Sequence, residues 1–316
     1  MKLGRAYELL VKHILINIGF SAVKSDGLYI FDGAPGQMIQ GLGEAHNADV
    51  LLEPPVQTPF YSRTRLLIEC KDYRRKVGLN TIRSSLGLRE DINHFEIVDI
   101  NRLQGRQRQR RHGIMYNYDR FSYQVAVAAL NGFTVPAQEF AATHRIPLLE
   151  FDKMPFWRDF CALLGYRHLD FYCDASELVR HPEQVTENQI IDFANEIGQH
   201  MAVAVTNSGQ LLFLYRISGK RNDFSDLYRL HWENPSSPWT LQSGGQTYSF
   251  QLPKSILKKW LENISSDLEL KKEAINCKAE FLSSMIVYYS DNYLPAVKMI
   301  SIDKYALADA KERLMV

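Results

Sequence analysis

The hydrophobic positions in the first 165 residues predict helices that alternate with short strands. Apolar residues recur at steps of three and four in the predicted helices, as in an amphipathic helix, and shorter apolar runs between turn residues are typical of buried strands. The closing strand, helix and strand are typical of a crossover in an α/β sheet. The predicted helices are 4–18, 81–95 and 138–143, and the predicted strands are 28–31, 48–52, 65–71, 124–130 and 146–150.

Beyond residue 165 most of the predicted elements are strands. Asn207-Ser208-Gly209 predicts a hairpin turn between the first two of them. From this change of pattern we predict two domains, 1–165 and 166–316, the second a smaller, mostly β (α+β) domain. The predicted strands are 202–205, 211–217, 227–232, 239–241 and 248–252, and the predicted helices are 254–263 and 268–289.

The composition excludes several classes of protein. A hydrophobic fraction of 46% and a charged fraction of 23% are ordinary globular values, which exclude disordered and low-complexity chains. The apolar runs are far shorter than the roughly 20 residues of a membrane helix, and the charged N-terminal segment does not suit a signal peptide. The four cysteines form no CxxC pair, which excludes a disulfide scaffold and a cysteine-based zinc site. We therefore expect a cytoplasmic protein without a membrane segment.

The formal net charge of +1 hides a difference between the two parts of the chain. Residues 1–165 contain 21 Lys and Arg against 17 Asp and Glu, whereas the remainder contains 16 against 19. The basic excess is concentrated in residues 102–112, an eleven-residue stretch without an acid, which we call the basic cluster. Such a cluster is either a solvated loop or a phosphate-binding surface.

Glu69 and Lys71 are charged residues at the end of an otherwise apolar strand. Residues two apart share one face of a strand, so these two side chains project together while Cys70 points to the opposite side. Asp49 interrupts the preceding predicted strand in the same way. If the two strands pair as a hairpin, Asp49 and Glu69 meet, and two converging carboxylates repel unless a divalent cation lies between them.

Asp49 and Glu69 are therefore candidate ligands of Mg²⁺ or Mn²⁺, which bind through carboxylates, waters and phosphate oxygens. In this interpretation Lys71 orients or deprotonates the attacking water and stabilises charge on the phosphate. Glu8, on the first helix, completes the cation shell or holds a metal-bound water. The alternative is that Glu69 and Lys71 form a structural ion pair in an unrelated α/β protein.

The order of these residues resembles the PD-(D/E)xK nuclease superfamily, and within it the Mrr-like restriction endonucleases. The resemblance covers roughly residues 1–165, about half of the chain. One departure is that Ala48, rather than proline, precedes Asp49. The matching segments are Gly4-Arg5-Ala6-Tyr7-Glu8, the glycine-rich approach from Gln40 through His46 to Asp49, Ile68-Glu69-Cys70-Lys71, and the closing segment 121–149.

This resemblance implies a restriction-endonuclease-like fold, a mixed sheet flanked by helices. It also implies an Mg²⁺-dependent endonuclease that hydrolyses DNA phosphodiesters by a metal-activated water, in restriction or anti-phage defence. Carried over position by position, Glu8, Asp49, Glu69 and Lys71 fall on the catalytic positions of the family.

Several further residues are candidates for contact with DNA. Arg74 and Arg75 continue the Glu69–Lys71 strand into a basic turn, and beside a nuclease site the basic cluster is interpreted as phosphate-binding. His46, three residues before Asp49, and Gln40 are accessory candidates. The arginines of the basic cluster assigned to DNA are Arg106, Arg108, Arg110 and Arg111.

A second hypothesis for the function stays open. The chain is a catalytically silent nucleic-acid-binding or scaffold subunit of a defence complex, which has kept the nuclease fold and depends on another subunit for cleavage. The intact set of acids and lysine argues against it, because a site without catalysis has no physical need for converging carboxylates. The second domain is expected to serve recognition, a protein partner or homodimerisation, and its negative charge disfavours broad phosphate contact.

Overall fold

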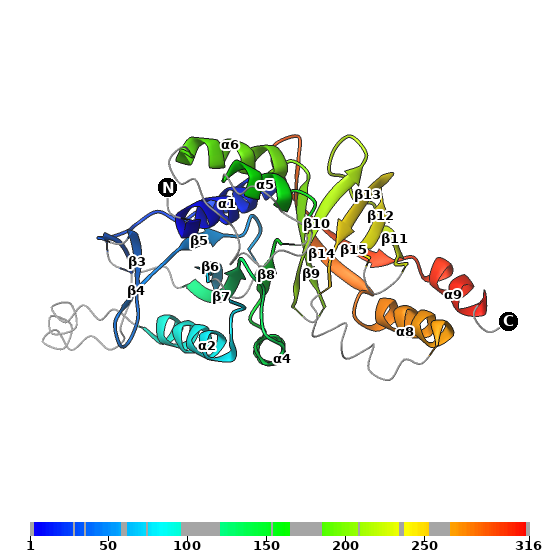
Figure 1. The fold of residues 1–316 in the computed structure, drawn as a ribbon, viewed down its shortest axis with the longest axis horizontal. Coiled ribbons are helices and arrows are strands. Elements are labelled where there is room, and N and C mark those ends of the chain that lie inside the picture. Colours follow the sequence, from blue (N-terminus) through cyan, green and yellow to red (C-terminus); the bar gives the residue numbers. More distant parts are fainter. Residues whose placement is uncertain are drawn as a thin grey trace, which may run out of the picture.

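The protein has a mixed α/β fold in the computed structural model (Figure 1). Two larger sheets, one open and one closed into a barrel, lie beside each other with helices packed around them. None of the helices in the described ranges is long and apolar enough to cross a membrane. The structure describes residues 3–27, 29–34, 36–57, 62–73, 75–95, 121–152, 154–164, 185–207, 209–233, 237–252 and 266–313.

The open sheet has five strands in the order β1-β5-β6-β7-β8. β5 and β6 pair antiparallel, as the sequence predicts, and β6, β7 and β8 run parallel. The predicted strand, helix and strand of the crossover are confirmed as β7, α4 and β8. The bounds are β1 Ser21–Ala22, β5 Val50–Glu53, β6 Arg63–Lys71, β7 Phe121–Ala129, α4 Val135–His144 and β8 Leu148–Glu150.

Helices cover both faces of the open sheet because its central strands are apolar on both sides. Helix α1, Leu3–Ile18, packs against one face, which includes Leu66 and Ile68. Helix α2, Leu79–His94, and α4 cover the other face, as Figure 1 shows. A small sheet lies beside them and consists of β2 Ile30–Gly33, β3 Gly36–Gln40 and β4 Ala45–Asn47.

The second part of the chain forms a closed seven-stranded barrel in the order β10-β13-β12-β11-β15-β14-β9. Aromatic and aliphatic side chains such as Trp239, Tyr248 and Phe250 fill it and are almost completely buried. The bounds are β9 Met201–Thr206, β10 Leu211–Ser218, β11 Leu227–His231, β12 Trp239–Ser243, β13 Gln246–Phe250, β14 Ser284–Asp291 and β15 Leu294–Ile302.

The predicted helix 268–289 is wrong in its second half. Helix α8, Asp267–Glu280, is followed by the hairpin of β14 and β15. Asn292 and Tyr293 form its two-residue turn with φ angles of 49° and 65°, the left-handed geometry that a tight hairpin needs. The apolar residues of β14 continue the pattern of the preceding helix because β14 buries residues on both of its faces. Some of them lie in the barrel, and Tyr288 packs against the core that contains α1. The predicted helix 254–263 lies outside the described residues.

One hydrophobic core joins the two parts of the chain. Helix α1 packs against α6, Glu187–Gly198, and both contact the outside of the barrel. Figure 1 shows α5, Trp157–Leu163, and α6 above the open sheet, next to the barrel. The C-terminal helix α9, Lys304–Arg313, buries none of its residues. The predicted boundary at residue 165 begins a stretch, 165–184, that the structure does not describe.

Candidate functional site

Asp49, Glu69 and Lys71 come together where β5 begins and β6 ends. Val50 pairs with Ile68, so Asp49, directly before β5, lies beside the end of β6. The backbone N–H of Cys70 donates to Asp49 Oδ2 at 2.8 Å, and Lys71 Nζ lies 3.0 Å from Glu69 Oε2. The structure therefore brings the acids and the lysine into one group, which we call the carboxylate cluster.

The carboxylate cluster lies on the face of the sheet that α2 covers. The Glu69 side chain is 14% exposed and that of Lys71 is 21% exposed, so both are mostly buried and still reached by solvent. Ser85 of α2, fully buried, donates its hydroxyl to Glu69 Oε2 at 3.2 Å, and Asn47 Nδ2 donates to Asp49 Oδ1 at 2.8 Å. Sequence reasoning missed Ser85 and Asn47. The position of Asn47, two residues before Asp49, could have indicated a contact with that carboxylate. Ser85 could not have been predicted, because no neighbouring residue in the sequence connects it with Glu69.

Burial and neighbouring charges shift the ionisation of the cluster. Burial raises the pKa of Asp49, and the Glu69 charge adds to this, while the Cys70 N–H and Lys71 oppose it. The pKa of Lys71 is also raised: burial alone would lower it, and the adjacent Glu69 carboxylate outweighs burial. Lys71 is therefore held as an ammonium group at neutral pH, and Asp49 is a carboxylate whose charge is destabilised by its surroundings.

Glu8 approaches the cluster from α1. Burial raises its pKa, and the charge of Asp49 contributes to the same shift. Arg5 Nη1 lies 3.3 Å from Glu8 Oε2, and Arg5 Nε donates to Glu187 Oε1 on α6 at 3.0 Å. A residue from the second part of the chain thus holds the arginine that pairs with Glu8, a connection that sequence reasoning missed.

A further acidic residue, Glu150 on β8, lies level with Lys71 across the open sheet. The parallel register aligns Lys71 with Ala129 on β7 and Ala129 with Glu150 on β8. In a parallel sheet, aligned residues project to the same face, so Lys71 and Glu150 share a face two strand spacings apart, about 10 Å. Glu150 was not a candidate from the sequence because this alignment depends on the order of the strands.

The two accessory candidates lie in the small sheet rather than in the carboxylate cluster. His46 on β4 is paired with Asp91 of α2, with 2.6 Å between Nε2 and Oδ2, and the N–H of Gly43 donates to the same carboxylate. Gln40 is on β3, opposite Ala45. The His46–Asp91 pair fastens the small sheet to α2, so the structure gives His46 a partner other than the cluster.

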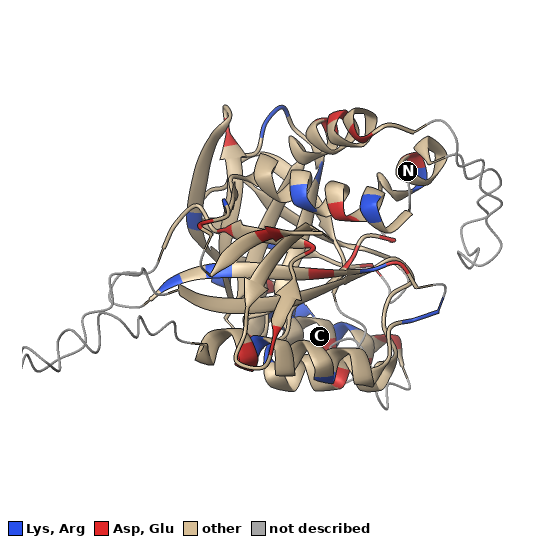
Figure 2. Ribbon diagram, turned by 90° about the vertical axis from the view of Figure 1, so that its left-hand side faces the viewer, with Lys and Arg blue, Asp and Glu red and all other residues tan. Residues whose placement is uncertain are grey.

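Most of the arginines predicted to bind DNA lie outside the described residues. Arg75 is exposed in the segment that follows β6. The others, Arg74, Arg106, Arg108, Arg110 and Arg111, lie outside the described residues. In the described part, acidic and basic residues are interspersed (Figure 2).

The donor set of the cluster fits a hard cation with few protein ligands. Within the described ranges, no three His, Cys, Asp or Glu side chains converge so that they could hold a metal ion. Asp49 and Glu69 are two carboxylates, and Mg²⁺ is usually bound by one or two carboxylates together with waters and phosphate oxygens. The residues present therefore fit Mg²⁺ or Mn²⁺ at a site whose remaining ligands are waters or other oxygen atoms.

Asp49→Asn should stabilise the metal-free protein at neutral pH. The pKa of Asp49 in the folded protein is raised above its ordinary value of 3.8. The stability that protonated Asp49 contributes is therefore fully present below pH 3.8 and is lost as the pH rises through the raised pKa. Asparagine keeps an oxygen for the Cys70 N–H without the charge. We expect a higher melting temperature than that of the parent at neutral pH, and a difference that disappears in acid.

The matched control for this prediction is Asp91→Asn. Its hydrogen bonds from His46 and the Gly43 N–H lower the pKa of Asp91, so loss of this carboxylate should destabilise the protein at neutral pH. Thermal melts in EDTA across the pH range compare the two variants. Equal destabilisation by both substitutions would show that the negative charge of Asp49 does not destabilise the folded protein.

Comparisons with known proteins add little. The chain matches no protein-family model and no curated protein. Among solved structures, it is similar to the "Crystal Structure of Protein of Unknown Function AF1548", with 16% identity and a TM-score of 0.31 over 52% of this chain and 67% of that chain. A likeness this weak carries no argument about fold or function.

Proposed function

We propose that the protein is a metal-dependent DNA endonuclease of the PD-(D/E)xK type with a restriction-endonuclease-like, Mrr-like first part. The observation that supports it is the carboxylate cluster, in which Asp49 approaches the strand end bearing Glu69 and Lys71 and is tied to it by the Cys70 N–H. The raised pKa of Asp49 means that its buried charge destabilises the fold, and such groups are frequent at functional sites. The proposed setting is restriction or anti-phage defence.

In the proposed mechanism Asp49 and Glu69 hold Mg²⁺ or Mn²⁺. When bound, the cation supplies charge stabilisation and lowers the pKa of water. Asn47 and Ser85 hold the two carboxylates in orientation through their hydrogen bonds. Both contacts hold the two carboxylates in position before a substrate binds.

Lys71 acts as a charged hydrogen-bond donor in this mechanism. Its raised pKa keeps it protonated, so it stabilises negative charge that develops on the phosphate and does not remove a proton. The sequence left open whether Lys71 orients or deprotonates water, and the ion pair with Glu69 favours the donor role. The raised pKa of Glu8 makes its carboxylate a better proton acceptor than an ordinary glutamate. In the proposed mechanism Glu8 therefore accepts the proton of the attacking water.

The test of this function is cleavage of plasmid DNA by the full chain. We expect nicked and linear DNA with Mg²⁺ or Mn²⁺ and none in EDTA, with methylated and unmethylated plasmid compared in parallel. A calorimetric Mn²⁺ titration distinguishes the alternatives. Metal binding without cleavage would support the silent subunit, and an absence of both would leave Glu69 and Lys71 as a structural ion pair.

A further inference from the structure

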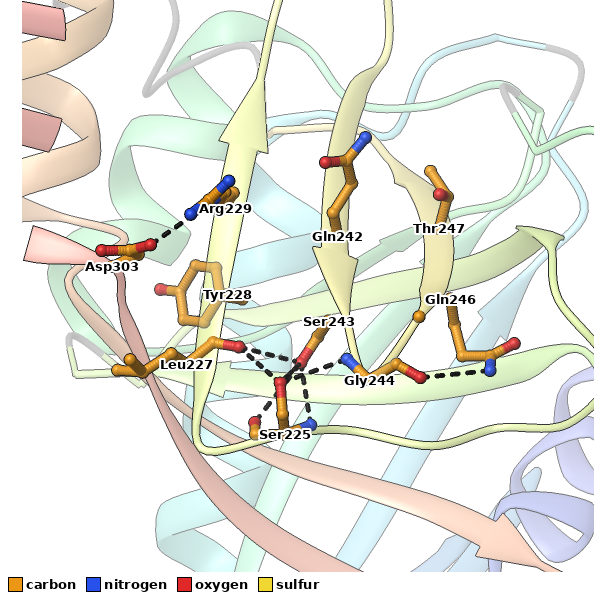
Figure 3. Close-up of a pocket in the computed structure, with 11 residues that line it drawn as sticks. Ser225, Leu227, Tyr228, Arg229, Gln242, Ser243, Gly244, Gln246, Thr247 and Asp303 are labelled. Carbon is orange, nitrogen blue, oxygen red and sulfur yellow. Dashed lines mark hydrogen bonds and ion pairs between the residues drawn. The ribbon is translucent and has the colours of Figure 1, made fainter. Parts of the chain in front are cut away.

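A polar pocket of about 380 Å³ lies on the barrel, where β11, β12 and β13 run side by side (Figure 3). These strands are on the side of the barrel away from β5 and β6, so the pocket is separate from the carboxylate cluster (Figure 1). The register aligns Arg229 with Gln242 and Gln242 with Thr247. Three polar side chains therefore form a row across three strands, which we call the polar row.

Arg229 is held in place from one side. Its Nε donates to Asp303 Oδ2 at 3.0 Å, and the other oxygen of Asp303 accepts the N–H groups of Tyr305 and Ala306, both at 3.1 Å. The arginine side chain is nevertheless 68% exposed. In the described part of the chain this bond engages Nε alone, and neither Nη group has a hydrogen-bond partner. The guanidinium is thus oriented before any ligand arrives.

The floor of the pocket is a closed hydrogen-bond network. Ser225 Oγ donates to the Leu227 carbonyl at 2.7 Å and accepts the Gly244 N–H at 3.1 Å, and Ser243 Oγ lies 3.0 Å from it. Gly244 and Gly245 have φ angles of 57° and 76°, as in a tight hairpin turn, and a Cβ on Gly244 would meet the Asp223 carbonyl oxygen. Ser225, Ser243 and Gly244 satisfy one another, while Gln246 Oε1, buried against Gly219, accepts no hydrogen bond from the described residues. The polar row therefore supplies the donors that remain for a ligand.

We infer that this pocket binds a phosphate ester group. A guanidinium, a carboxamide and a hydroxyl all donate hydrogen bonds, and they stand about 4.8 Å apart across the strands. Phosphate oxygens only accept, and the fork of an arginine matches them in pairs. Arg229 and Asp303 together are neutral, so binding depends on this geometry rather than on long-range attraction.

A nucleic-acid backbone and a free nucleotide present the same group, and the inference holds whether or not the carboxylate cluster cleaves DNA. The test uses the full chain in EDTA with three probes: a labelled oligothymidylate by anisotropy, and AMP and inorganic phosphate by calorimetry. Arg229→Gln should weaken binding about three- to tenfold. For the oligothymidylate, it should also reduce the slope of log affinity against log salt by about one unit.

Two further variants keep the test interpretable. Gln242→Glu places a carboxylate directly opposite Arg229, where it pairs with the guanidinium and repels a phosphate, so it should weaken binding while Arg229 itself is kept. Arg221→Gln is the matched control, because Arg221 is 58% exposed on the same barrel and pairs loosely with Asp291 at 3.8 Å. Melting temperatures of all three variants verify folding.

The probes distinguish the two sources of the phosphate group. A loss confined to the oligothymidylate identifies the nucleic-acid backbone, and a loss that extends to AMP identifies a free nucleotide. A loss with inorganic phosphate as well shows that the pocket recognises the phosphate group alone. The inference is overturned if the parent protein binds none of the probes, or if Arg229→Gln and Arg221→Gln change binding equally.

Discussion

Lys71→Ala should reduce plasmid cleavage by about 100- to 1,000-fold, the usual effect of removing one donor that stabilises developing charge. Binding of Mn²⁺ should remain or become stronger, because the substitution releases Glu69 from an ion pair at 3.0 Å. The separation of these two effects is the signature of a lysine that acts on the phosphate and not on the cation. A structural ion pair would produce no such separation.

Asp49→Ala should behave differently and abolish both cleavage and metal binding. It removes one of only two carboxylates at a site where the described residues offer no third acidic, histidine or cysteine ligand. Glu69→Ala should resemble Asp49→Ala, and Glu8→Ala should be milder because Glu8 is paired with Arg5 and acts on water.

The measurement is plasmid cleavage beside calorimetric Mn²⁺ titration for these variants. Lys24→Ala is a suitable control, since Lys24 is exposed on the loop after β1. If Lys71→Ala cuts as well as Lys24→Ala, the nuclease proposal fails. It fails equally if the parent protein binds no metal.

A fragment that ends at Leu164 should be unfolded or molten. Helix α1 packs against large apolar side chains from beyond that point, and burial of each stabilises by about 1.5–3 kcal/mol. The sum is comparable with the roughly 5–15 kcal/mol that separates folded from unfolded domains. The side chains that the fragment loses from this core are Ile190, Ile197, Met201, Val203 and Phe213.

Far-UV and near-UV circular dichroism with a denaturant titration measures this effect. The control is co-expression of the fragment with residues 185–316, which should restore a cooperative transition by covering α1 again. A cooperative transition of the fragment alone, close to that of the full chain, would show that the first part folds by itself and would favour the predicted division into two domains.

The sequence by itself determined the local elements and the identity of the clustered charges. Apolar periodicity depends on neighbouring residues, so α1, β5, β6 and most strands of the barrel were predictable within a few residues. Charges inside an apolar strand are visible in the same way, which is why Asp49, Glu69 and Lys71 were candidates. That Asp49 and Glu69 lie close together depended on the pairing of their strands as a hairpin, which the sequence offered only as a condition.

Only the tertiary structure decided which distant groups support the cluster. Ser85 reaches Glu69 because α2 packs across β6, and Glu187 reaches Arg5 because α6 packs along α1. The sharing of one core between the two parts, and the polar row of Arg229, likewise depend on strand order and register. Local sequence carries no record of these contacts, because each one requires two distant segments to be packed first.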